Sequence, residues 1–102
     1  MDKPTTWTFL TNHAQVLLCL AETPDIRLRD VAERVGITER AAQRILADLV
    51  DAGYVKRTRV GRRNHYTVHG ELPQRHPLHN GRPVGELLRV IEPEIAPTAR
   101  RH

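Results

Sequence analysis

The chain has 102 residues, which is enough for one domain with a single modest core. Its longest apolar run, 16–21, is far shorter than the roughly 20 residues that a membrane-spanning helix needs, so no membrane segment is expected. The N-terminus has no basic patch followed by an apolar stretch, and the single cysteine, Cys19, cannot form an internal disulfide. Both features predict a cytoplasmic protein.

The net charge of +4 is distributed unevenly along the chain. Residues 1–53 carry six basic and eight acidic side chains, whereas residues 54–102 carry ten and four. The segment 54–69 contains no acid and five cations, namely Lys56, Arg57, Arg59, Arg62 and Arg63. Such a basic stripe is typical of a nucleic-acid surface, although a solvated face is the ordinary alternative.

Residues 1–10 are predicted to form an extended N-terminal arm, because they contain Pro4 and three threonines together with two aromatic residues. Trp7 and Phe9 are expected to pack either on the core of the monomer or on a second subunit.

The first predicted helix runs to about Glu22. Thr11 or Asn12 can cap its start, and Gln15 is spaced to complete a capping box with Asn12. The run 16–21 makes this helix apolar around most of its circumference, which predicts a central, buried position.

Pro24 and its neighbours break the first helix, and Ile26 with Arg27 is predicted to form a short strand. The next helix begins at Leu28. Its apolar residues recur at helical spacing and therefore share one face, namely Leu28, Val31, Ala32 and Val35.

Gly36 is predicted to end that helix in the left-handed conformation, and Thr38 to cap a further helix after only a short turn. A second apolar stripe follows before Gly53, made of Ala42, Ile45, Leu46, Leu49 and Val50. Two helices joined so closely must cross steeply, and the small Ala32 lies where they would meet. The stretch 28–53 therefore predicts a helix-turn-helix, the alternative being a helical hairpin of another small domain.

After Gly53 the apolar pattern changes from the helical period to alternation. β-Branched and aromatic residues on both sides of Gly61 predict a two-stranded hairpin over 54–68. An isolated hairpin is marginal in water, so it must pack on the helices or on the predicted strand near Ile26.

The last third of the chain divides into three parts. Residues 70–83 hold three prolines and two glycines and are expected to form a surface loop. Residues 84–92 predict a short helix that buries one face on the first helix or in a dimer, because it is too short to be stable alone. The tail, 93–102, is predicted to be disordered.

Helix, strand, helix, turn, helix and hairpin is the order of a winged helix. Residues 11–68 resemble the DNA-binding domains of the MarR and ArsR families of bacterial transcriptional regulators, above all in ITERAAQRILADLVDAGYVKRTRVGRRNHYTVH. The resemblance implies a recognition helix over 38–52 in the major groove and a wing over 54–68 on the minor groove and backbone. Family members usually carry further helices for dimerisation or ligand binding, for which this chain has little room, so the resemblance leaves any small-molecule effector unknown.

The resemblance gives DNA-contacting roles to the matching positions Thr38, Arg40, Gln43, Arg44, Arg62 and Arg63. Gln43 and Arg44 are the candidates for base contacts, since Gln pairs with adenine and Arg with guanine. The phosphate candidates are cations of the helix and the wing, namely Arg40, Lys56, Arg57, Arg59, Arg62 and Arg63. Arg62 or Arg63 can also enter a narrow minor groove, and Thr38 begins a helix whose N–H groups can face a phosphate.

Four histidines, His65, His69, His76 and His79, invite comparison with metal-sensing relatives, but surface histidines are the ordinary interpretation. Zinc sites need three or four convergent ligands, and the only cysteine lies in the apolar helix. No metal or other cofactor is predicted. Nor does the chain carry a phosphate-binding glycine loop or a nucleophile motif, so no enzyme is predicted.

The sequence therefore predicts a mainly α protein with a small antiparallel hairpin, an α+β winged helix-turn-helix over residues 11–69. Its predicted function is sequence-specific binding of double-stranded DNA as a homodimeric transcriptional regulator. The alternatives are a protein-interaction module of the same fold and a metal-responsive regulator.

Overall fold

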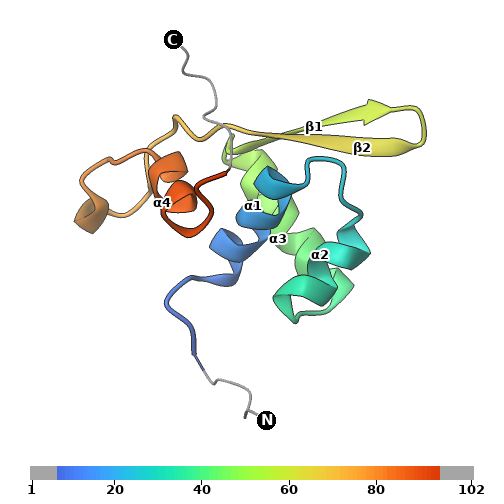
Figure 1. Ribbon diagram of the computed structural model, residues 1–102, viewed down its shortest axis with the longest axis horizontal. Helices are drawn as coiled ribbons and strands as arrows, with labels where there is room; N and C mark the ends of the chain where they lie inside the picture. Colours follow the sequence, from blue (N-terminus) through green and yellow to red (C-terminus); the bar gives the residue numbers. More distant parts are fainter. Residues whose placement is uncertain (1–6, 95–102) are drawn as a thin grey trace.

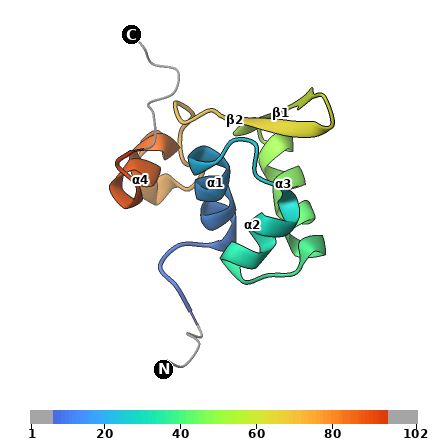
Figure 2. The same cartoon turned by 45° about the vertical axis from the view of Figure 1, so that its right-hand side comes forward.

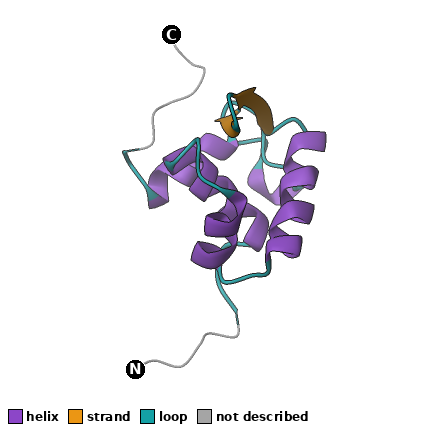
Figure 3. Cartoon of the chain, turned by 90° about the vertical axis from the view of Figure 1, so that its right-hand side faces the viewer, coloured by secondary structure: helices purple, strands orange, loops and turns teal. Residues whose placement is uncertain are grey.

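Helix α1 lies at the centre of the fold, between α4 on one side and the pair α2 and α3 on the other (Figure 1). The hairpin of β1 and β2 crosses one end of these helices and projects beyond them (Figures 1 and 3). The computed structural model describes residues 7–94, and its elements there are α1 (Asn12–Glu22), α2 (Leu28–Val35), α3 (Glu39–Asp51), β1 (Val55–Val60), β2 (Arg63–Val68), the 3₁₀ helix η1 (Pro77–His79) and α4 (Val84–Ile91). The predicted fold class is confirmed.

The core forms where the apolar faces of these elements meet. Val16 and Leu20 of α1 are fully buried, and they share one cluster with Val31 of α2, Leu46 of α3 and Tyr66 of β2. Burying such side chains stabilises the fold by roughly 1.5–3 kcal/mol each. Cys19 belongs to the same cluster, and burial raises the pKa of its thiol.

The turn between α2 and α3 has the predicted chemistry. Gly36 adopts φ +88°, and the N–H groups of Gly36 and Ile37 both donate to the carbonyl of Ala32, at 2.8 and 3.0 Å. Thr38 caps α3, because its hydroxyl accepts the N–H of Ala41 at 3.0 Å. Ala32 is buried, as expected where two helices cross closely.

The hairpin pairs Val55 with Val68 at its base and Val60 with Arg63 at its tip. Its turn contains only Gly61 and Arg62, with Gly61 at φ +62°, so β2 begins directly after the turn at Arg63. The base of the hairpin is buried through Val55, Tyr66 and Val68, whereas the outer half is exposed.

Helix α4 docks on the core through Leu88, which is 2% exposed. Its first turn comes so close to the chain after β2 that a Cβ on Gly85 would lie 3.0 Å from the carbonyl oxygen of Gly70. The amide of Gly85 also donates to that carbonyl at 2.8 Å. The sequence predicted that this helix packs either on the first helix or in a dimer. In the structure Leu88 packs in the core of the monomer, while Val90 and Ile91 are exposed.

The predicted strand at Ile26 and Arg27 is wrong. Pro24 has no N–H, and the N–H of Ile26 donates back to the Thr23 carbonyl at 3.0 Å, so the segment forms a turn. It still lies along β2, because the N–H of Tyr66 donates to the Pro24 carbonyl at 2.8 Å.

Two predictions about the start of the chain also need correction. Thr11 caps α1, and Gln15 donates to the Leu10 carbonyl and the Thr8 hydroxyl at 3.3 Å, so it forms no capping box with Asn12. The cap lies one residue earlier than that box requires.

Packing of the aromatic arm on the monomer core is also wrong. Trp7 and Phe9 are 67% and 92% exposed, and they meet each other edge to face with ring centroids 5.1 Å apart. Residues 1–6 of the predicted arm and 95–102 of the predicted tail lie outside the described residues. Within residues 7–94, no helix is long and apolar enough to span a membrane.

Candidate nucleic-acid interface

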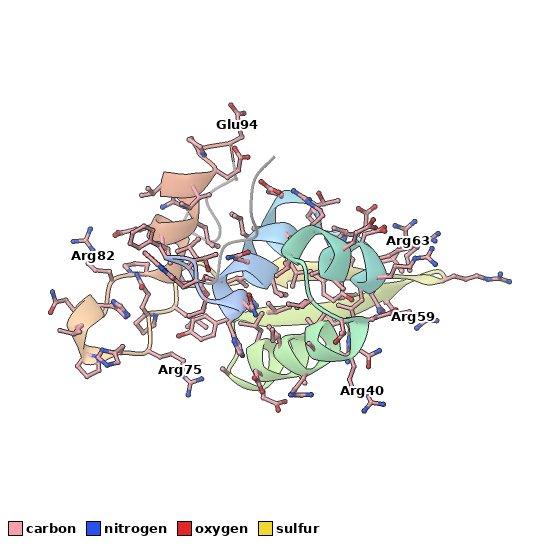
Figure 4. All side chains as sticks on the ribbon, turned by 90° about the horizontal axis from the view of Figure 1, so that it is seen from below. Arg40, Arg59, Arg63, Arg75, Arg82 and Glu94 are labelled. Atoms are coloured by element: carbon pink, nitrogen blue, oxygen red, sulfur yellow. The ribbon has the colours of Figure 1, made fainter. Side chains whose placement is uncertain are left out.

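Helix α3 turns a polar face to solvent. Its apolar residues are buried against α1 and α2, which leaves Glu39, Arg40, Gln43, Arg44 and Ala47 exposed on the opposite side. Figure 4 shows Arg40 projecting from α3 away from the body of the molecule. Arg40, Gln43 and Arg44 thus share the exposed face that the sequence predicted.

The charge of α3 changes sign along its length. Arg40 and Arg44 lie in the N-terminal half, whereas Asp48 and Asp51 lie in the C-terminal half. Asp48 also binds the ring of His13, with 2.8 Å between its carboxylate oxygen and Nε2. A polyanion is therefore attracted to the start of α3 and repelled from its end.

The start of α3 offers backbone donors as well as cations. Thr38 caps the N–H of Ala41 with its hydroxyl, and its carbonyl accepts the N–H of Ala42 at 3.0 Å. Within residues 7–94, the N–H groups of Glu39 and Arg40 have no protein acceptor. Such N–H groups point along the helix axis, where phosphate oxygens are favoured.

A cleft of about 660 Å³ separates α3 from the hairpin, which lies above it in Figure 2. Gln43 and Ala47 line the α3 side, and Arg57, Asn64 and Arg62 line the hairpin side. Three acidic residues also line the cleft, namely Asp25, Glu39 and Asp51. Cations and acids are therefore mixed in the cleft.

The register of the hairpin divides the basic stripe between two faces. Arg57 pairs with the buried Tyr66, so Arg57 and Arg59 share the face that leans on the helices. Lys56 pairs with the exposed Thr67 on the opposite face. The structure therefore brings Arg57 and Arg62 to the same cleft as Gln43 and leaves Lys56 apart from them.

Two arginines of the hairpin already have protein partners. The Nε–H of Arg59 donates to the Gly61 carbonyl at 3.3 Å, within the turn. Arg63 donates from Nη2 to the Asp25 carbonyl at 2.7 Å, although Asp25 lies 38 residues earlier in the chain. Figure 4 shows Arg59 and Arg63 on opposite sides of the hairpin.

Arg27 is a cation that the sequence analysis did not single out. It is exposed, occupies the N-cap position of α2 and lines the cleft with Arg57 and Arg62. The sequence analysis placed Arg27 in a predicted strand near the hairpin but assigned no role to its charge. Its position immediately before the apolar stripe of α2 was the available signal.

The histidines do not converge within the described part of the chain. No group of three His, Cys, Asp or Glu side chains there could hold a metal ion. His69 lies 3.5 Å from the carboxylate of Glu71, while the rings of His76 and His79 are 5.5 Å apart and 58° from parallel.

The MarR family model matches residues 7–63, which is more than half of the chain. The chain belongs to the MarR family. Members of this family are transcriptional regulators, so the predicted resemblance to MarR-type regulators is confirmed. The match covers the helix-turn-helix, β1 and the turn of the hairpin. No curated protein matches the chain.

Three solved structures share the fold of this MarR-family chain. The MarR family protein Rv2887 of Mycobacterium tuberculosis, solved with salicylic acid, is 24% identical, with a TM-score of 0.56 over 80% of this chain and 57% of its own. The regulator PcaV of Streptomyces coelicolor, solved with its natural ligand, is 22% identical and has a TM-score of 0.53. The match covers 85% of this chain and 63% of PcaV. The IscR of T. potens is 18% identical and has a TM-score of 0.57. The match covers 90% of this chain and 94% of IscR.

At these identities the structural neighbours establish the fold alone. The chain spans about six tenths of the length of Rv2887 and PcaV.

Proposed function

We propose that this MarR-family protein is a transcriptional regulator that binds double-stranded DNA sequence-specifically, with α3 in the major groove and the hairpin as a wing. The observation that carries the proposal is the exposed face at the start of α3, where Arg40, Gln43 and Arg44 stand together beside uncapped N–H groups. Gln43 and Arg44 have the donors and acceptors to read base edges. Arg40 is placed to bind a phosphate.

The wing supplies the second part of the interface. Arg62 occupies the two-residue turn at the tip, and Arg57 lines the cleft behind it. A guanidinium at the end of a narrow ribbon can enter the minor groove, where closely spaced phosphates concentrate negative potential. Arg27 adds a cation on the side of α2.

A homodimer is part of this proposal. Apolar side chains stand exposed away from the wing, namely Trp7, Phe9, Leu78, Val90 and Ile91. Large aromatic residues contribute strongly to subunit interfaces. Two linked copies bind a palindromic site much more tightly than one copy binds a half-site.

A salt titration tests the DNA interface. The affinity for a duplex should fall with salt, and Arg40→Ala should reduce the slope of log K against log salt by about one unit. Arg82→Ala is the matched control, because Arg82 is paired with Glu86 at 2.7 Å and lies at the opposite end of the molecule (Figure 4). Equal slopes for the two variants would remove α3 from the interface.

The alternative is a protein-interaction module in which the basic wing meets an acidic partner. Such a module would bind duplexes weakly and without sequence preference. Its slope of log K against log salt would be the same for Arg40→Ala and the wild type.

A cleft of about 920 Å³ favours a second role, the binding of a small effector. Its wall includes Leu17, Leu49 and Leu87, while His13 and Arg75 stand among its polar residues. Rv2887 and PcaV were each solved with a small ligand. An apolar floor with Arg75 beside it suits an aromatic carboxylate, although Asp48 and Asp51 also line the cleft.

Salicylate is the probe for this second role. It should raise the thermal midpoint of the wild type in a saturable way, by an amount set by RT ln(1 + [L]/Kd), and raise that of Arg75→Ala less. An unchanged midpoint at millimolar salicylate would contradict binding in this cleft.

A further inference from the structure

The outer half of the wing has little to hold it in place. Only its base is buried, and the residues from Lys56 to Arg63 are exposed apart from their cross-strand pairing. A two-stranded ribbon is marginal in water and free to bend. An interface that places a wing tip in a DNA groove nevertheless needs that tip at a fixed distance from α3.

The turn after α1 supplies the missing support. Pro24 and Asp25 lie along the free edge of β2, and their carbonyls accept two hydrogen bonds from that strand. The Tyr66 amide donates to the Pro24 carbonyl at 2.8 Å, and the Arg63 guanidinium donates to the Asp25 carbonyl at 2.7 Å. Ile26, the next residue, is buried in the core and fixes the turn to the body of the protein.

We propose that Arg63 is a positioning residue that latches the wing to the turn at Pro24 and Asp25, and so sets where Arg62 meets DNA. The inference rests on the proposed function, because it assigns separate parts to two neighbouring arginines of the wing. Arg62 stands in the turn of the hairpin. Within residues 7–94, the Arg62 guanidinium makes no hydrogen bond to the protein, whereas the Arg63 guanidinium does. Arg63 is the first residue of β2 after the turn, close to the tip of the wing. A contact there restricts the angle between the hairpin and the helices more than a contact at the base does.

The latch has its own spectroscopic probe in the free protein. The Tyr66 N–H points away from β1 toward the Pro24 carbonyl, so its hydrogen exchange measures the docking of β2 on the turn. Arg63→Ala should raise the exchange rate of this amide about tenfold. Arg62→Ala is the matched control, since it removes the same charge one residue away and should leave the rate unchanged. Arg63→Lys keeps a cationic donor and should restore most of the protection.

A DNA measurement then tests the positioning. In the wild-type background, Arg62→Ala should weaken binding roughly tenfold, as expected for a charged hydrogen bond, and reduce the salt slope by about one unit. In the Arg63→Ala background, the same substitution should cost less than about threefold, because an unlatched wing no longer presents Arg62 in one place.

The outcomes separate the latch from the proposed function. Equal Tyr66 exchange in Arg62→Ala and Arg63→Ala overturns the latch, and additive losses in the DNA cycle overturn the positioning of Arg62. Absence of duplex binding by every variant, the wild type included, overturns the proposed function and with it the role toward DNA. The exchange experiment still decides in that case whether Arg63 holds the wing.

Discussion

The two ends of this molecule expose different chemistry. Exposed arginines occur at both ends, with Arg40, Arg59 and Arg63 at the end formed by α2, α3 and the hairpin, and Arg75 and Arg82 at the other (Figure 4). Away from the wing, the arm and the end of α4 expose large apolar side chains, including Trp7, Phe9 and Val90.

The difference indicates two kinds of partner. Exposed arginines are hydrated in the free protein, and on binding DNA they replace these water contacts by hydrogen bonds to phosphates or base edges. Exposed aromatic rings gain only when another apolar surface covers them. One end of the molecule is thus suited to a polyanion and the other to protein, and each prediction below changes one end and asks whether the other responds.

The largest expected effect is at the apolar end. Replacing Trp7 and Phe9 together by Ser should weaken the dimer by at least about 2 kcal/mol, a roughly thirtyfold higher dissociation constant, as for central aromatic residues of interfaces. Sedimentation equilibrium measures this constant. Thr8→Ser, which changes the residue between the two aromatic side chains but keeps its hydroxyl, is the control. If the double variant dimerises like the wild type, the arm does not form the interface.

Arg44→Ala tests the other end. The substitution should cost about 1–3 kcal/mol on a preferred duplex and relax the preference at one base pair. The comparison is a pair of anisotropy titrations, on the preferred and on a scrambled duplex. A loss as large on the scrambled duplex would mean that Arg44 contacts phosphate and reads no base.

Gly85→Ala should weaken the docking of α4 and lower the stability of the protein. An added Cβ meets the Gly70 backbone at 3.0 Å, and overpacking of this kind costs about 1–3 kcal/mol. Urea unfolding gives the loss of stability. Gly81→Ala is not an equivalent control, because Gly81 has φ +69°. Arg89→Ala, at a polar position of α4 that is not buried, serves instead. Unchanged stability in Gly85→Ala would contradict the tight docking of α4.

Thr38→Ala should have the smallest effect. Loss of the cap on Ala41 costs about 1 kcal/mol of stability, and Thr38→Ser should restore it because serine keeps the hydroxyl. Thermal unfolding measures both. Equal midpoints for the Ala and Ser variants would show that the cap adds nothing to α3.

Local signals made much of the fold predictable. Gly36 and Thr38 act at short range, so their roles in the turn followed from residue type and spacing alone. The continuous apolar run of α1 and the periodicity of the apolar residues in α3 identified the core for the same reason.

The contacts that the sequence did not reveal are long-range. Arg63 meets a backbone carbonyl 38 residues away, and a carbonyl acceptor leaves no trace in residue type. The division of the basic stripe depended on the hairpin register, which a turn one or two residues longer would have changed. Arg27 was missed because the candidate cations were taken only from the recognition helix and the wing, and Arg27 lies in neither.

The candidate base contacts were predictable because they need only the exposed face of one helix. Gln43 and Arg44 lie opposite the apolar stripe of α3, as the period required. Their contact with DNA stays a prediction.

The central claim is that α3 reads a DNA sequence, and selection from a random-duplex pool with the purified wild-type protein tests it most directly. We predict an enriched palindrome whose half-sites are centred about one helical turn apart. We further predict that Gln43→Ala loses the preference at one position of that site. Recovery of no preferred sequence, with equally weak binding to every duplex, would contradict the claim.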